Sequence, residues 1–167
     1  MKRWIALLIA LTVASSQGIP PVFRLHVIAN SDSAEDQAVK LKVRDAIIEQ
    51  MGEMDGAADR EQAEAYTKEH LQELVERANR VLRENGFSYT ATAEIGSFDF
   101  PDKTYGGICF PAGTYRALRI HLGQSIGQNW WCVLFPPLCL LEPTQTEANW
   151  QMQDGVEYQS FFANLFK

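Results

Sequence analysis

Three cysteines and three histidines are the side chains in this 167-residue sequence that could form a nucleophile–base pair or bind a metal. A catalytic thiol needs a lowered pKa and a base within hydrogen-bond reach, and Cys132 with His121 is the pair to consider. The neighbours of Cys132 are bulky and apolar, and such surroundings raise the pKa of a thiol. The sequence therefore favours a disulfide or a packed thiol at this position, and we predict no catalytic residue.

Metal binding and acid–base catalysis are not indicated either. The histidines are scattered, without HxxxH or CxxC spacing. Glu94, Asp99 and Asp102 could be imagined as an acid–base pair for glycoside hydrolysis, but acidic residues near strand ends are common and no motif marks these. Because the sequence also lacks GxSxG, P-loop and GxGxxG motifs, we predict no metal, no cofactor and no small-molecule substrate.

Cysteine pairing depends on the compartment. Outside the cytoplasm, three cysteines mean one bridge and one spare thiol, or three free thiols. Cys132 and Cys139 are separated by six residues that include Pro136 and Pro137, so the chain could fold back and join them. Closing so small a loop would stabilise the folded state by roughly 2 kcal/mol, less any strain. Cys132 and Cys139 are therefore the disulfide candidate, and Cys109 has no assigned role.

The stretch around these cysteines, "NWWCVLFPPLCLLE" from Asn129 to Glu142, carries hardly a charge. Its first half predicts a strand that is apolar on both faces, and the two prolines after it must end the strand because they cannot donate ladder hydrogen bonds. If helices cover one face of the sheet, the other is covered by the C-terminal tail or is a docking surface. Core packing and partner contact both remain open interpretations.

The elements that position this stretch are predicted as a strand, two helices and then further strands. Residues 22–28 alternate as a strand does, and Ser33 with Asp36 approximates the capping box of the next helix. A second helix is predicted over 59–84, and strands over 87–95, 115–122 and 129–135. We therefore predict an α+β fold, a mainly antiparallel sheet with two helices packed on one face. The periodicity of the tail does not decide between strand and helix.

The N-terminus has the pattern of a secretory signal peptide. Lys2 and Arg3 precede an apolar run from Trp4 to Ala14, and Ala14-Ser15-Ser16 offers small residues for cleavage before Gln17. The run is shorter than the roughly 20 apolar residues that span a bilayer as a helix, although an uncleaved N-terminal anchor is the rival interpretation. We expect residues 1–16 to be a signal peptide and residues 17–167 a single secreted α+β domain.

The charge balance excludes one class of partner. Removal of residues 1–16 takes away two basic residues, so the net charge would fall from −6 to −8. An acidic body without a Lys/Arg cluster argues against binding to nucleic acid or to an anionic membrane surface. We predict no nucleic-acid partner.

Two blocks of the sequence resemble a known family. "RLHVIANSDSAEDQAVKLKVRDAI" and "YGGICFPAGTYRALRIHLGQSIGQNWWCVLFPPLC" are similar to the two most characteristic blocks of stage II sporulation protein R of endospore-forming bacteria. The resemblance covers about residues 22 to 142 and includes Cys132 and Cys139. Cys109 and the C-terminal tail lie outside the family pattern.

The resemblance implies a signalling protein rather than an enzyme. Family members are made in the forespore and secreted across its membrane into the space between forespore and mother cell. There they activate a membrane-embedded aspartic protease, which processes pro-sigma-E in the mother cell. The expected partner is therefore that protease, through its extracytoplasmic membrane region.

The resemblance does not say which residues touch the protease. Because contact hot spots are enriched in Trp and Tyr, we take the rigid apolar residues of the second block as candidates. The predicted partner-binding residues are Trp130, Trp131, Phe135, Pro136, Pro137, Leu138, Tyr105, Phe110 and Pro111. Two alternatives stay open: a secreted thiol or acid/base hydrolase of the cell envelope, with a pocket around Cys132, and an envelope-structural or lipid-surface domain.

Overall fold

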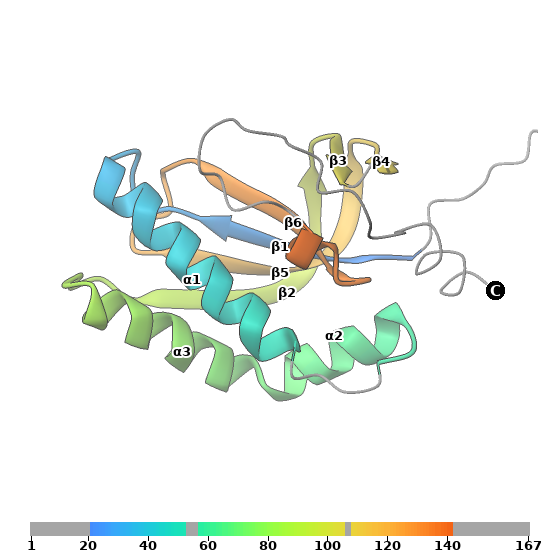
Figure 1. The fold of residues 1–167 in the computed structure, drawn as a ribbon, viewed down its shortest axis with the longest axis horizontal. Coiled ribbons are helices and arrows are strands. Elements are labelled where there is room, and N and C mark those ends of the chain that lie inside the picture. The colour runs from blue at the N-terminus through green and yellow to red at the C-terminus, as the bar shows by residue number, and fades with distance from the viewer. Residues whose placement is uncertain (1–20, 53–56, 106–107, 142–167) are drawn as a thin grey trace, which may run out of the picture.

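The structure is a computed structural model that describes residues 21–52, 57–105 and 108–141. Its elements are β1 (Phe23–Ile28), α1 (Ala34–Gly52), α2 (Arg60–Glu69), α3 (Leu71–Glu84), β2 (Ala91–Phe100), β3 (Lys103–Tyr105), β4 (Ile108–Phe110), β5 (Gly113–Leu122), β6 (Asn129–Phe135) and the 3₁₀ helix η1 (Leu138–Leu141) (Figure 1). The described part is α+β, as predicted. The predicted signal peptide and the C-terminal tail lie outside the described residues.

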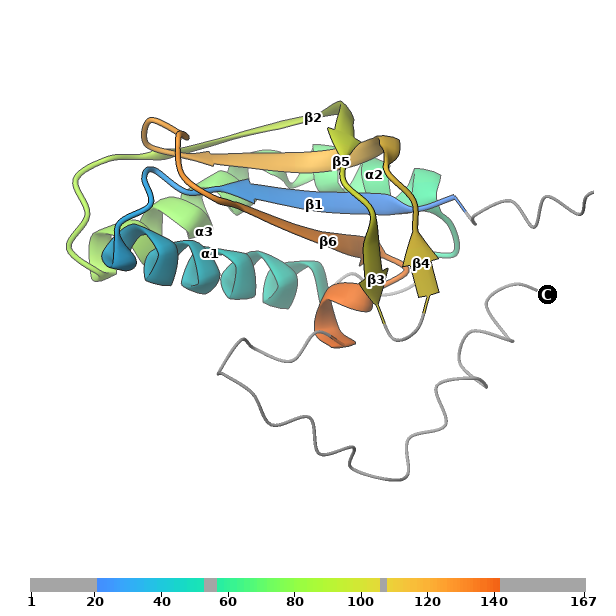
Figure 2. The same cartoon turned by 90° about the horizontal axis from the view of Figure 1, so that it is seen from above.

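Four strands form one sheet in the order β2-β5-β1-β6. β5 is parallel to β1 and antiparallel to β2, and β6 is antiparallel to β1. The sheet is therefore mixed but mostly antiparallel. β3 and β4 form a separate hairpin, which crosses β1 and β6 on the side of the sheet away from the helices (Figure 2). This arrangement leaves β6 at an edge of the sheet.

Three α-helices accompany the sheet in the described part of the chain, where the sequence predicts two. The helix predicted over 59–84 is divided at His70, whose backbone N–H bonds to the Tyr66 carbonyl as α2 ends. The two parts have different tertiary partners: α3 lies along α1 (Figure 1), whereas Glu64 of α2 pairs with Arg116 of β5. The division was not visible in the sequence because no glycine or proline marks it and the buried positions keep helical spacing across it, namely Ala63, Thr67, Leu74, Ala78 and Leu82.

The strand predicted over 87–95 begins later, at Ala91, and extends to Phe100. The Phe87 N–H donates to the Leu82 carbonyl, and Gly86 has a φ of 82°, so these residues close α3. Residues 87–90 were thus wrongly assigned to the strand, because the Phe87 N–H is used at the end of α3, whereas residues 91–95 lie in β2 as predicted. The strands predicted over 115–122 and 129–135 correspond to most of β5 and to all of β6.

The start of α1 is fixed by hydrogen bonds to side chains. Ser33 Oγ accepts the Asp36 N–H at 3.1 Å, as an N-cap does. The Asp36 carboxylate does not complete the capping box, because it accepts from Asn30, Ser31 and Tyr89 instead. Burial alone would raise the pKa of Asp36, but these hydrogen bonds outweigh it and hold the pKa below its ordinary value.

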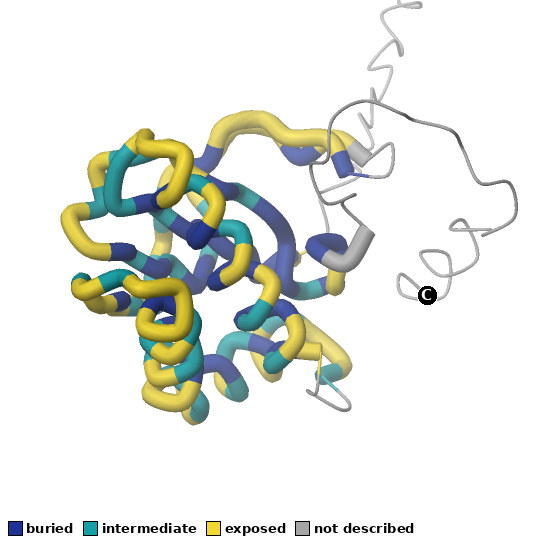
Figure 3. Tube along the Cα trace, turned by 60° about the vertical axis from the view of Figure 1, so that its left-hand side comes forward, coloured by how far each residue is buried: buried dark blue, intermediate teal, exposed yellow. Residues whose placement is uncertain are grey.

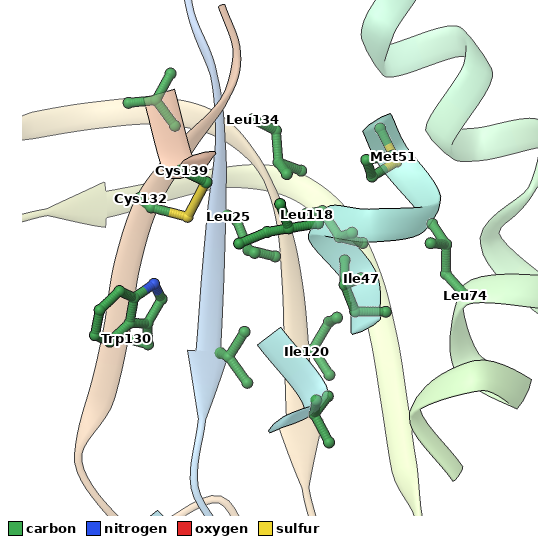
Figure 4. Close-up of a cluster of buried hydrophobic side chains, with 14 of the residues drawn as sticks. Leu25, Ile47, Met51, Leu74, Leu118, Ile120, Trp130, Cys132, Leu134 and Cys139 are labelled. Atoms are coloured by element: carbon green, nitrogen blue, oxygen red, sulfur yellow. A yellow bond between two sulfur atoms is a disulfide. The ribbon is translucent and has the colours of Figure 1, made fainter. Parts of the chain in front are cut away.

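The core lies between the sheet and the helices. Leu25 of β1 and Leu118 of β5 meet Ile47 of α1 and Leu74 of α3, all without exposed surface (Figure 4). Buried residues follow the sheet, and exposed ones gather on the outer faces of the helices and in the turns (Figure 3). Within the described residues, none of the helices is long and apolar enough to cross a bilayer.

Candidate functional site

The segment from Asn129 to Leu141 is the candidate site. Among the described strands, β6 pairs only with β1, with Trp130 opposite Val27 and Cys132 opposite Leu25. A disulfide joins Cys132 to Cys139, whose Cα atoms are 5.4 Å apart, and ties η1 to β6 (Figure 4). Cys109 is exposed and unbridged. The segment after the strand is therefore held against it covalently.

One side of β6 faces the core. Trp130, Cys132 and Leu134 lie with Leu25 and Leu118 among the buried side chains (Figure 4). The Trp130 ring is 9% exposed and lies 4.2 Å from the guanidinium carbon of Arg44. Its Nε1 is buried and finds no hydrogen-bond acceptor within the described ranges, a costly state for a polar group.

The opposite side of the sheet carries a buried arginine among aromatic rings. The Arg24 guanidinium lies 4.2 Å from the Phe100 ring centroid and 4.7 Å from that of Tyr115. Its Nη2 donates to the Tyr105 hydroxyl at 3.2 Å, and that hydroxyl donates to the Trp131 carbonyl at 2.9 Å. The β3–β4 hairpin therefore covers part of this face. The sequence analysis did not predict the hairpin and assigned the face to the C-terminal tail or to a partner.

Trp131 is half-buried on this same side and is held by stacking. Its ring lies 3.8 Å from that of His26, nearly parallel, and 4.8 Å from that of Phe100. Burial lowers the pKa of His26 from 6.5 to about 4, against the opposing hydrogen bond with Asn129. The imidazole is thus neutral at neutral pH, and the Trp131 ring has a fixed orientation.

The predicted partner-binding residues differ in exposure. Pro111 and Pro137 are exposed, and Trp131 and Phe135 are half-buried. The other five are buried: Trp130, Pro136, Leu138, Tyr105 and Phe110. Buried side chains can position the exposed ones but do not form a surface while the fold is closed. Which residues touch a partner stays a prediction.

A groove of about 440 Å³ lies between α1 and β6. It is lined by Gln37, Ala38, Lys40, Leu41, Lys103, Gln128, Asn129, Trp130 and Trp131. Lys40, 5% exposed, donates from Nζ to Gln37 Oε1 at 2.6 Å and to the Gln128 carbonyl at 3.1 Å. Burial lowers the pKa of Lys40, whereas the nearby Asp32 acts to raise it. The sequence analysis missed Lys40, although its helical spacing from the apolar residues Val43 and Ile47 was a usable signal.

A second group of polar side chains resembles a hydrolase triad. His121 Nδ1 lies 3.2 Å from Ser125 Oγ, and His121 Nε2 lies 2.9 Å from Glu94 Oε1. Ser125 has a φ of 56°, and the three residues line an open depression of about 520 Å³. Hydrogen bonds from His121 and then Arg119 lower the pKa of Glu94, so this carboxylate is charged. No sequence motif marks Ser125.

The loop that carries Ser125 has its backbone N–H groups already in use. An oxyanion hole needs free N–H groups beside the nucleophile. Every backbone N–H from Gly123 to Gln128 is already donated within the fold, to Thr90, Asn30, Leu122, Asn30, Ala29 and Asp32 in turn. The triad-like contact therefore has no oxyanion site in this loop.

The thiol and acidic sites considered from the sequence are not brought together. Cys132 is fully buried in a disulfide, on the sheet side opposite to His121. Glu94 contacts His121, whereas Asp99 accepts from Thr114 farther along β2 and β5. In the described ranges, no three His, Cys, Asp or Glu side chains are placed to hold a metal ion.

Comparisons with known proteins find similar sequences. A family model described as "Stage II sporulation protein R (spore_II_R)" matches residues 20–145. The curated "Stage II sporulation protein R" of Bacillus subtilis (strain 168) is 36% identical over 132 residues, which cover 78% of this chain and 59% of that protein. The match thus spans less than two thirds of that relative's length. No solved structure is significantly similar to the chain.

Proposed function

The chain belongs to the stage II sporulation protein R family, and on that premise we propose that it is a secreted signal of endospore formation. It is secreted across the forespore membrane into the space between forespore and mother cell. There it activates the membrane-embedded aspartic protease that processes pro-sigma-E in the mother cell. The observation that carries the proposal is the family match over residues 20–145, which includes all of β6 and η1.

The geometry of the candidate site suits a ligand that acts by binding. To move a receptor from mostly inactive to mostly active, a ligand must bind the active state about 5.5 kcal/mol more tightly. Trp131 is half-exposed, stacked on His26, and lies on a strand tied to η1 by the disulfide. Because these contacts order the side chain before binding, little conformational entropy is lost when a partner docks.

The test is pro-sigma-E processing in a sporulating strain that lacks its own copy of the signal. The parent chain should restore processing. Trp131→Ala and Pro137→Glu should each reduce it at least tenfold, since one removes an anchor and the other adds charge at an exposed contact. Ile126→Ala, at the most exposed large apolar side chain of the described residues, is the matched control and should restore processing fully.

Secretion and folding of each variant are measured in the same cells, by immunoblotting of the secreted fraction and by resistance to protease. A secreted, protease-resistant parent that restores no processing contradicts the proposed function. Full processing by both Trp131→Ala and Pro137→Glu contradicts the contact surface and leaves the signalling role standing.

The Ser125–His121–Glu94 contact is the observation that favours the hydrolase alternative. Ser125→Ala removes the only hydroxyl of this group. If the protein is a binding signal, Ser125→Ala should restore pro-sigma-E processing as well as the parent does. Loss of processing by a well-secreted Ser125→Ala would support chemistry at this loop. The lipid-surface alternative has little support, because Ile126 is the one large apolar side chain that stands exposed in the described part.

A further inference from the structure

The groove between α1 and β6 has the features of a peptide-binding site. We propose that it binds an extended acidic segment of a partner protein, which adds as a strand to the open edge of β6. The assignment of that segment to the activated protease rests on the proposed function. The binding chemistry of the groove is independent of that function.

The backbone of β6 offers hydrogen-bonding groups to an added strand. β6 ends the order β2-β5-β1-β6, and no other described strand pairs with its second side. The Ala29 N–H donates to the Gln128 carbonyl at 3.3 Å. In an antiparallel pair, successive residues alternate between bonding to the neighbouring strand and facing away from it. Because Gln128 bonds to the residue directly after β1, the N–H and C=O groups of Trp130 also face β1, and those of Asn129 and Trp131 face away from it.

The neighbouring elements give this edge a wall and an end. α1 lies beyond the outer edge of β6 in Figure 2, and the groove runs between them. The hairpin closes one end, because the Tyr105 hydroxyl donates to the Trp131 carbonyl. An edge strand flanked by a helix is the geometry in which extended peptides add to a sheet while their side chains enter the adjoining groove.

The charge of the groove selects for an acidic segment. Lys40 is 5% exposed. Among the described residues, its ammonium bonds to the neutral oxygens of Gln37 and Gln128, and Asp32 is nearby but not in ion-pair contact. Lys103 lines the same groove and is exposed. The chain as a whole carries a net charge of −6, so this lysine pair stands out on an acidic molecule.

Trp130 gives the groove an aromatic wall. The side chain is 9% exposed, and its Nε1 finds no acceptor among the described residues. A carboxylate in the groove would supply an anion for Lys40 and Lys103, which both line it. A second copy of this chain fits less well, because pairing two β6 edges would bring the lysines of both copies together.

The test begins with a phage-displayed library of random decapeptides selected against the full secreted protein. Peptides enriched in Asp or Glu are expected, and their affinity is measured by calorimetry. Lys103→Glu should weaken their binding at least tenfold. Lys68→Glu makes the same charge change at an exposed position of α2 and should leave binding unchanged. Both substituted side chains are exposed, so both variants should fold.

Amide hydrogen exchange tests the added strand directly. The N–H groups of Asn129 and Trp131 should exchange rapidly in the free protein and become protected at least tenfold when a selected peptide binds. Any of three results would overturn the proposal. No acidic peptide is selected, Lys103→Glu leaves the affinity of the selected peptides unchanged, or the amides of Asn129 and Trp131 gain no protection. Protection already present in the free chain, with no peptide binding, would show that the chain's own tail fills the groove.

The two proposals can fail separately. If the parent restores pro-sigma-E processing and Lys103→Glu does so equally well, the groove is not where the protease binds, and the signalling function still stands. If the parent restores nothing while peptide binding behaves as expected, the groove stands and the proposed function fails.

Discussion

Arg24, His26 and Asp36 are ionisable side chains that the fold places at 5% exposure or less. Each is stabilised in a different way: aromatic rings and a tyrosine hydroxyl surround Arg24, the His26 ring is stacked and neutral, and three donors reach the Asp36 carboxylate. Since burying an ionisable group without such partners costs several kcal/mol, these contacts fix where the three side chains can lie.

His26 should make the protein less stable in mild acid. The unfolded chain takes up a proton near pH 6.5, whereas burial holds the folded pKa at about 4, so stability is lost as pH falls from 6.5 toward 4. The expected loss is about 2 kcal/mol between pH 7 and pH 5. Urea unfolding across this range should show it in the parent, and His26→Asn should remove that part of the slope.

His70→Asn is the matched control for this prediction, because His70 lies on the other side of the molecule, between α2 and α3. It should keep the slope of the parent. An unchanged slope in His26→Asn would show that His26 is not the group that titrates.

At the scale of elements, β6 and the loop before it are held by contacts with the start of α1. The Gly127 and Gln128 N–H groups donate to the Ala29 carbonyl and to Asp32, and the Gln128 carbonyl accepts from Lys40. The disulfide between Cys132 and Cys139 ties η1 back to β6. The candidate site is therefore anchored at its N-terminal end by hydrogen bonds to the start of α1, and its two parts are cross-linked to each other.

Gly127 is required at its position because the backbone of Ser31 approaches it closely. A Cβ at residue 127 would overlap the Ser31 carbonyl oxygen. Gly127→Ala should therefore lower the free energy of unfolding by about 2 kcal/mol, the usual cost of overpacking. Gly52→Ala, where a Cβ meets nothing within 4 Å, should cause no loss. Equal stability of the two variants, measured by thermal unfolding, would contradict this account.

The disulfide should stabilise the end of β6 against unfolding. Replacing both Cys132 and Cys139 by serine should cost about 2.5 kcal/mol from loop closure alone. A reducing agent should destabilise the parent by a similar amount and leave the double variant unaffected in denaturant titrations. Cys109→Ser should change nothing, because this thiol is exposed and unbridged. Reductant sensitivity that persisted in the double variant would contradict this assignment.

At the scale of the whole molecule, the sheet lies between the helices and the β3–β4 hairpin (Figure 2). Arg24 and Tyr105 link the hairpin to the sheet, and the Tyr105 hydroxyl also reaches the carbonyl of Trp131. The orientation of the hairpin and that of the predicted contact residue Trp131 are therefore coupled.

Tyr105→Phe tests this coupling. Loss of the hydroxyl leaves buried groups unsatisfied and should cost about 1–3 kcal/mol of unfolding free energy. Tyr115→Phe is the matched control, because its hydroxyl donates to the Pro111 carbonyl in an exposed position and should contribute under about 1 kcal/mol. A Tyr105→Phe protein as stable as Tyr115→Phe would show that the hairpin is held without this hydroxyl.

Local patterns in the sequence were enough to predict the α+β class, the bounds of β6, the Ser33 cap and the cysteine pair that the structure joins. These features depend on alternation, capping chemistry and short chain separations, which neighbouring residues determine. The signal peptide and the partner-binding residues remain predictions.

Only the tertiary structure decided which of the candidate side chains are exposed. Trp130 and Leu138 are buried because α1, β1 and η1 pack around them, and the hairpin covers Arg24. The Ser125–His121–Glu94 contact and the groove at Lys40 join residues far apart in the chain. Burial and charge pairing depend on neighbours that are distant in the chain. The periodicity of the sequence reports only on nearby residues and therefore cannot predict them.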